Sequence, residues 1–467
     1  MKVSFRYTPL VLSTLIVSVF SCGAPAGDDK VELVLAMEDV ESIKTGLEKI
    51  LADHSKNFKA LTNLAAIELM QDELPQAAEH LNRALSVMKR RSDLETVYLL
   101  RVTESELALK QKRHEAAKKA AEAALQVNPS DPLHSRLYLS RALYALRTHG
   151  NSEAALKAYQ DSWENDKAIF LHADFEAYAD LLAEAENWDA ALTVSYEYFK
   201  RFGYRFGMGA YLSTLHEKAG NFPYSVLAAY LDLRYGLAIG AASLQQVADN
   251  LKAVEQTLRD NNADEGIPYL KALQDMEKGR WAAAYTALIG ENIENPIHAY
   301  LGLAAAIESG QAGQEVLAPM LLLEDYYSAY PEYYYRIAHE YARYPLKYGF
   351  AEQRPVLEKV IFLAPGSAMA AESRRVLCRL SGIDERFAAD IYLLGEQAAA
   401  VRQYAETGRT ETLAPLVRLL DFKPNPYTQA AEKALSDLSD IPPVRTYLTQ
   451  VKNKTPLRNE RITYILN

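Results

Sequence analysis

Residues 61–85 have the sequence LTNLAAIELMQDELPQAAEHLNRAL, in which apolar side chains recur at intervals of three and four positions. This spacing predicts amphipathic helices, and the segment is long enough for two of them. The small residues Ala65 and Ala77 stand twelve positions apart, one in each expected helix. Two helices cross closely only where both side chains at the crossing are small. The segment therefore predicts a tightly packed helical hairpin.

The same spacing of twelve positions between a first-helix and a second-helix residue recurs along the chain, with small residues at both places except at Leu143. The later pairs are Ser105 and Ala117, Leu143 and Ala155, Ala179 and Ala191, Ser213 and Ser225, and Ala272 and Ala284. The period breaks near residues 234–265, where one helix is expected at about 241–260. A degenerate copy around Leu303 and Gly310, a helix pair at about 337–365 and a closing helix at 367–380 follow. Helix pairs that repeat about every 34 residues are typical of an α-helical repeat array.

These residues resemble the tetratricopeptide repeat family over residues 34–382. The resemblance implies an all-α fold, a superhelical solenoid of helix-turn-helix units; a series of four-helix bundles or another α-solenoid is the alternative. Residues 383–467 depart from the period. Within them, residues 413–420, a Pro-Asn-Pro turn at 424–426 and an apolar stripe at 430–438 predict a HEAT-like helix pair, which would close the array as a C-terminal cap.

The N-terminus has the order of an export signal. Lys2 and Arg6 precede an apolar run of 11 residues at 10–20, too short to span a bilayer as a mature helix. Residues 19–22, Val-Phe-Ser-Cys, resemble the lipobox of a spirochaete-like bacterial lipoprotein. The resemblance implies cleavage of residues 1–21, a lipid on Cys22 and a lipidated tether at 22–33. An ordinary secretory signal or an uncleaved anchor is the alternative.

Charge and cysteine content exclude several classes of protein. The net charge is −10, and removal of residues 1–21 would make it −12, because both charged residues of the signal are positive. Such a chain is not expected to bind nucleic acid, and the lipid rather than the surface would have to hold it on a membrane. Two cysteines form no disulfide framework and no Cys-based zinc site. Cys378 is expected to be a buried, inert thiol.

Motifs that carry catalysis are missing from the sequence. There is no phosphate-binding Gly-rich loop ending in Gly-Lys-Ser/Thr, no Gly-x-Ser-x-Gly elbow and no His-Glu-x-x-His. We therefore expect no catalytic residue, no metal and no cofactor.

Two groups of residues are candidates for binding. Nine of the 30 tyrosines lie in residues 326–348, and the densest part is the candidate partner-binding cluster Tyr326, Tyr327, Tyr330, Tyr333, Tyr334 and Tyr335. Tyrosine suits contact with peptide or sugar, but such rings also fill wide spaces between helices. A second aromatic group at a repeat junction is expected in the core: Tyr196, Tyr198, Phe199, Phe202, Tyr204, Phe206 and Tyr211. The candidate basic patch is Lys110, Lys112, Arg113, Lys118 and Lys119; its alternative is a solvated helix face.

The family's binding surface on chaperone C-termini is not reproduced. The places on the first helices that hold Lys and Asn in those members hold Thr62, Ala66, Val102, Glu106, Ser140 and Tyr144 here. The expectation from sequence is a non-catalytic, lipid-anchored scaffold in a bacterial cell envelope, on the outer membrane, that binds another envelope protein. The main alternative is a surface-exposed adhesin that binds a host protein, glycan or matrix. An envelope hydrolase is a third, weaker alternative.

Overall fold

The computed structural model of the chain describes residues 28–37, 39–90, 92–289, 295–310, 314–390, 394–422 and 424–466. Over these residues the protein is all-α and has no β-strand, as predicted. Consecutive helices pack in pairs, so the chain is a repeat-like helical array. Contacts divide it into two units, residues 1–191 and 192–467, and each unit is described by itself. Cys22 and the predicted signal peptide lie outside the described residues.

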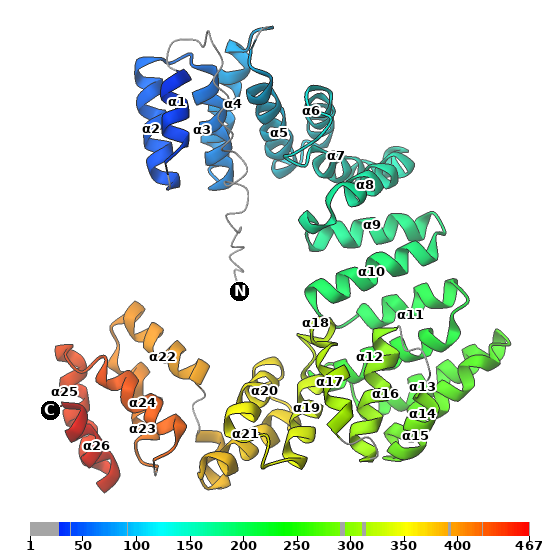
Figure 1. Ribbon diagram of the computed structural model, residues 1–467, viewed down its shortest axis with the longest axis vertical. Coiled ribbons are helices and arrows are strands. Elements are labelled where there is room, and N and C mark those ends of the chain that lie inside the picture. Colours follow the sequence, from blue (N-terminus) through cyan, green and yellow to red (C-terminus); the bar gives the residue numbers. More distant parts are fainter. Residues whose placement is uncertain are drawn as a thin grey trace. The chain divides into compact units, whose positions relative to one another are not determined.

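The first unit consists of helices that follow one another as antiparallel neighbours (Figure 1). They are α1 (Asp28–Leu35), α2 (Val40–Asp53), α3 (Phe58–Met70), α4 (Leu74–Val87), α5 (Leu94–Lys110), α6 (His114–Val127), α7 (Ser135–Ala145), α8 (Ser152–Asp166) and α9 (His172–Glu184), with short 3₁₀ turns η2 (Arg147–His149) and η3 (Lys167–Ile169). Helix α10 (Trp188–Phe202) spans the division between the units. Helix α1 occupies part of the predicted tether at 22–33, because Val31 and Val34 bury one face of it.

The predicted close crossings are present. Ala65, Ala77 and Ala117 are fully buried, and the Ser105 hydroxyl donates a hydrogen bond of 2.9 Å to the Ala117 carbonyl oxygen across the α5–α6 crossing. In the α11–α12 hairpin the hydroxyls of Ser213 and Ser225 lie 2.9 Å apart. A small side chain at these places therefore brings the two helices together, and serine adds a hydrogen bond between them.

The six hairpins also share one turn geometry. In each, the residue seven positions after the first-helix residue and five before the second-helix residue has a positive φ: Asp72 (62°), Lys112 (58°), Gly150 (84°), Glu186 (57°), Gly220 (76°) and Gly279 (71°). Five of the turns also have the hydrogen bond that closes a Schellman motif: Glu73 to Glu68, Arg113 to Ala108, Asn187 to Leu182, Asn221 to His216 and Arg280 to Asp275, at 2.7–2.9 Å. The repeat thus extends from the crossing residues to the backbone of the turn.

The second unit continues with α11 (Met208–Lys218), α12 (Phe222–Ala238), α13 (Leu244–Asp260), η4 (Asp264–Gly266), α14 (Ile267–Glu277), α15 (Trp281–Leu288), α16 (Pro296–Ser309), η5 (Gln314–Val316), α17 (Leu317–Leu321), α18 (Glu324–Tyr327), α19 (Pro331–Arg343), α20 (Phe350–Leu363) and α21 (Ala368–Ser381). Helix α13 is the helix expected at the break in the period, and α21 is the predicted closing helix. The last elements are η6 (Glu385–Asp390), α22 (Leu394–Thr407), η7 (Thr410–Leu413), α23 (Ala414–Leu419), α24 (Pro426–Ser436), α25 (Pro442–Val451), η8 (Lys452–Lys454) and α26 (Pro456–Leu466).

The C-terminal helices share a hydrophobic core with α20 and α21. Buried Leu357 and Leu377 belong to the same cluster as Leu416, Leu435 and Ile462. The predicted helix pair corresponds to α23 and α24, and α22, α25 and α26 add to it. The C-terminal segment is therefore packed against the preceding helices.

A buried charge network joins four helices of the second unit. The Glu332 carboxylate on α19 lies 2.7 Å from an Arg234 guanidinium nitrogen on α12 and 2.5 Å from one of Arg336. Arg234 also pairs with Glu277 on α14 at 3.1 Å, and Arg336 with Glu308 on α16 at 2.9 Å. Burial would raise the pKa of Glu332, but the two arginines lower it to about 2. Glu332 is therefore an ionised carboxylate inside the protein.

Candidate partner-binding surfaces

The predicted tyrosine cluster lies on α18, on α19 and in the residues between them. Tyr327, Tyr330, Tyr333 and Tyr334 are buried, whereas Tyr326 and Tyr335 are half-buried. The Tyr327 hydroxyl donates a hydrogen bond to the Pro296 carbonyl oxygen at 3.1 Å, and that of Tyr333 to the Met320 carbonyl oxygen at 2.8 Å. The four buried rings therefore fill space between helices rather than form a binding face, and their hydroxyls are hydrogen-bonded within the chain.

The two aromatic groups of the sequence meet in one core. Tyr204 lies 5.6 Å from Tyr330 and Phe199 lies 5.2 Å from Tyr326, measured between ring centroids. Tyr198, Phe199 and Tyr204 are buried, as expected. Phe206, however, is 52% exposed: it lies between α10 and α11, and its ring covers Gly236 on α12 from outside, stacked on Tyr235. The expectation that Phe206 is a core residue is therefore wrong.

The predicted basic patch is at the surface of the first unit. Lys112 and Arg113 form the turn between α5 and α6, and Lys118 and Lys119 lie on α6. All except the half-buried Lys118 are exposed, and Lys110, at the end of α5, pairs with Asp72 at 2.9 Å. The buried face of α6 consists of alanines, so its lysines lie toward solvent. The patch is accessible, and one of its charges is offset by a carboxylate.

A second surface joins the first helices of three successive hairpins, α5, α7 and α9. We name five residues the first-helix strip: Glu106 on α5, Tyr138, Arg141 and Tyr144 on α7, and Arg147 in the η2 turn that follows α7. The Tyr138 hydroxyl donates a hydrogen bond to Glu106 on α5 at 3.0 Å. Three contacts lead to α9: Arg141 binds both oxygens of Asp174 at 2.7 Å, the Tyr144 hydroxyl lies 3.5 Å from Asp180, and Arg147 lies 3.9 Å from Glu184. Polar contacts thus connect consecutive first helices side to side.

The strip is preorganised and partly accessible. All five side chains are half-buried, and the Arg147 guanidinium lies 4.0 Å from the centroid of the Tyr144 ring. Burial raises the pKa of Glu106, opposed by the hydrogen bond from Tyr138 and by the charges of Lys110 and Arg141. Burial and the charge of Asp180 raise the pKa of Tyr144. The strip offers aromatic faces and both signs of charge, which suits a polar polypeptide segment.

The sequence pointed to only part of this strip. It placed Glu106 and Tyr144 at family binding positions but did not single out Tyr138, Arg141 and Arg147. The alternation of tyrosine and arginine at every third residue, 138, 141, 144 and 147, was the available signal, because residues three apart on a helix are neighbours. The other four family positions offer little to a partner: Thr62, Val102 and Ser140 are buried, and Ala66 has only a methyl side chain.

The part of the chain that the structure describes holds no metal-ligand cluster and no exposed thiol. No cluster of three or more His, Cys, Asp or Glu side chains there could hold a metal ion. Cys378 is buried, and burial, followed by the charges of Glu385 and Asp384, raises its thiol pKa to about 11. A thiol with this pKa is overwhelmingly protonated at neutral pH and is a poor nucleophile. None of the helices in the described ranges is both long and apolar enough to cross a bilayer.

Comparisons with known proteins add no family to this description. No protein-family model matches the chain, and no curated protein matches its sequence.

Proposed function

We propose that the chain is a non-catalytic tetratricopeptide scaffold, held on a bacterial envelope membrane by a lipid on Cys22, that binds a protein partner along the first-helix strip. In this proposal α22 to α26 form a HEAT-like cap on the array. The partner is a second envelope protein, and the first-helix strip that it contacts is polar and aromatic rather than aliphatic.

The observation that carries the proposal is the sixfold hairpin. Five of the six hairpins combine small residues at the crossing, a left-handed residue at a fixed distance and a Schellman closure, as is typical of tetratricopeptide repeats. The remaining hairpin keeps the left-handed turn at Gly150 but has Leu143 at the crossing. Stacked repeats hold their first helices in fixed positions, so a partner meets a surface that is already ordered. Binding then costs little conformational entropy on the receptor side.

The hydrogen bonds between the strip and the neighbouring helices also support a role in partner binding. Arg141 is tied to Asp174 by two hydrogen bonds, and Tyr138 is tied to Glu106, so neither ring nor guanidinium has to be immobilised when a partner arrives. Tyrosine and arginine are the residue types most enriched where binding energy concentrates. Arg147 and Tyr144, stacked on each other, are the expected centre of the contact.

A second candidate function has one observation in its favour. Lys112, Arg113 and Lys119 are exposed on a chain whose net charge is negative, so a basic surface stands out from an acidic background. A surface-exposed adhesin would use this patch to bind a sulfated glycan or an acidic matrix protein, with affinity that falls as salt increases. The two functions use different residues: four of the five strip residues lie on α7 and in the η2 turn, whereas the patch lies at the end of α5, in the following turn and on α6. They are therefore separable by position.

The test is photocrosslinking in living cells. A photoreactive phenylalanine replaces Tyr144 in the strip, Lys119 in the basic patch, or Lys157, an exposed residue of α8 that serves as the matched control. The proposal expects one discrete protein adduct from position 144 and none from 119 or 157. Adducts from position 119 alone, formed only when host cells or matrix are present, would favour the adhesin. Equal adducts from all three positions, or none from position 144, would contradict the scaffold.

A further inference from the structure

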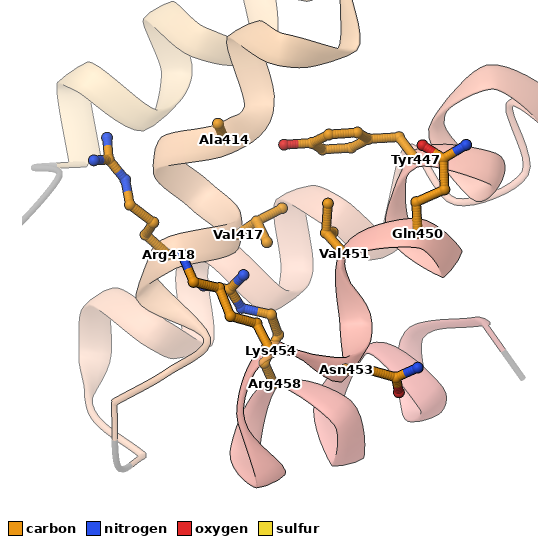
Figure 2. Close-up of a pocket in the computed structure, with 9 residues that line it drawn as sticks. All are labelled: Ala414, Val417, Arg418, Tyr447, Gln450, Val451, Asn453, Lys454 and Arg458. Carbon is orange, nitrogen blue, oxygen red and sulfur yellow. The ribbon is translucent and has the colours of Figure 1, made fainter.

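A pocket opens among the C-terminal helices, far along the chain from the strip. Its volume is about 690 Å³, and it lies between α23, α25, η8 and the start of α26 (Figure 2). Ala414, Val417 and Val451 form an apolar surface, and the Tyr447 ring extends across the opening toward Ala414. This volume is in the range of small-molecule sites, roughly 300–1,000 Å³.

The charged residues that line the pocket are all cationic. They are Arg418, Lys454 and Arg458, and no carboxylate is among the lining residues. Arg458 is buried and bonded to both carboxylate oxygens of Asp421, one of them at 2.9 Å, so its charge is offset. Arg418 and Lys454 are exposed, and the structure shows no ion pair for either of them within the described residues. Arg418 and Lys454 therefore bring positive charge to the rim, beside one nearby carboxylate, that of Glu411, whose charge also acts on Tyr447.

Three neutral polar side chains at the pocket have no hydrogen-bond partner among the residues that the structure describes. In the described part of the chain, the Tyr447 hydroxyl and the side-chain amides of Gln450 and Asn453 make no hydrogen bond. Figure 2 shows Gln450 and Asn453 on the right of the view, on or just after α25, whereas the Tyr447 hydroxyl extends toward Ala414. Each can donate a hydrogen bond to an oxygen of a ligand. The pocket combines an apolar wall, one aromatic ring, unused donors and excess positive charge.

We propose that this pocket binds a small organic anion, with an apolar or aromatic body against Val417, Val451 and Tyr447 and a carboxylate or phosphate group held by Lys454, to which Arg418 adds positive charge at the rim. Arg458 keeps its bond to Asp421 and serves to fix the start of α26. The site is separate from the first-helix strip and does not depend on the scaffold function.

The test uses the purified full chain and four probes observed by saturation-transfer NMR and calorimetry. Phenyl phosphate and benzoate carry the two possible anionic groups on the same ring, benzyl alcohol is the neutral analogue, and inorganic phosphate lacks the ring. We expect saturable binding of one or both aromatic anions, weakening as salt is added, and at least about tenfold weaker binding of benzyl alcohol and of inorganic phosphate. The stronger of the two anions identifies the group that the site prefers.

Variants locate the binding. R418A/K454A changes only exposed side chains and is expected to keep its helicity while weakening the aromatic anion by at least about tenfold. K433A, which removes a lysine with 80% of its side chain exposed on α24, is the matched control and should bind as the parent does. Absence of saturable binding up to about 10 mM, or equal affinities for the parent and R418A/K454A, would overturn the proposal.

Discussion

Replacing Glu332 with Gln perturbs the charge network of the second unit at its centre. The carboxylate is 5% exposed and accepts from Arg234, Arg336 and the Tyr330 hydroxyl. The glutamine keeps the shape but removes the charge, so two arginines lose a buried counter-ion while retaining Glu277 and Glu308. Removing one partner of a buried ion pair typically lowers the free energy of unfolding by about 3–5 kcal/mol. Because both arginines keep a second carboxylate, we expect a loss at the lower end, about 3 kcal/mol.

The pH dependence gives an independent magnitude. The Glu332 pKa is about 2 in the folded chain against an ordinary value of 4.5. A depressed carboxyl pKa stabilises the folded state above the unfolded-state pKa, and this stabilisation is lost as the pH falls from about 4.5 through about 2. The shift corresponds to about 3 kcal/mol, in agreement with the estimate from pair breaking. E332Q should therefore differ from the parent at pH 7 and converge with it in strong acid.

The assay is urea unfolding followed by far-UV circular dichroism, at several pH values between 7 and about 2. Hydrogen exchange of peptides from α12, α16 and α19 assigns the change to the network rather than to the first unit. E265Q, at an exposed position of η4, is the matched control and should lose at most about 0.5 kcal/mol. A loss below about 1 kcal/mol for E332Q at pH 7, or a loss that does not change with pH, would refute the reasoning.

Four further predictions concern the turns, the crossings, the thiol and the anchor. K112G should stabilise the first unit by about 1 kcal/mol and G279A should destabilise the second by a similar amount, because both positions have positive φ. A Cβ on Gly279 meets no atom within 4 Å, so thermal unfolding of the two variants measures the cost of the backbone conformation alone. Stability changes of the same sign would be inconsistent with equivalent turns. A117L should destabilise the α5–α6 hairpin by about 1–3 kcal/mol, measured by local hydrogen exchange, and unchanged protection would show that the crossing is not close. In a C22A background Cys378 should react with a thiol reagent only after urea is added, since it is buried and its pKa is about 11; reaction of the folded chain at the rate of a free cysteine would contradict this burial. C22A itself should lose membrane association and incorporation of labelled fatty acid in cells, whereas retention of both would assign the anchor to another residue.

The hairpins were predictable because their information is local. Apolar spacing and a small residue in each helix specify the pair Ala65 and Ala77 without knowledge of the rest of the chain. The glycine turns at 220 and 279 were predictable for the same reason. The equivalent turns at Lys112 and Glu186 could not be recognised, since Lys and Glu seldom have positive φ. At Asp72 the residue type was a weak signal, because aspartate has positive φ more often than most residues but far less often than glycine.

The tyrosine cluster shows where local information ends. A dense run of tyrosines is compatible with a core and with a binding face, because the ring is apolar and the hydroxyl is polar. The outcome depends on acceptors remote in sequence, such as the Pro296 carbonyl oxygen 31 residues before Tyr327. The contacts of the strip are equally non-local: Arg141 meets Asp174 33 residues later. The C-terminal pocket likewise depends on how α23, α25 and α26 meet.

Binding of the captured partner to strip variants tests the central claim most directly. R147E reverses a half-buried charge stacked on Tyr144, and K157E makes the same reversal on the exposed face of α8. With the protein crosslinked at position 144 purified and titrated onto the full chain, the scaffold proposal predicts at least about tenfold weaker binding to R147E and unchanged binding to K157E. Equal affinities for the parent, R147E and K157E would contradict recognition through the first-helix strip.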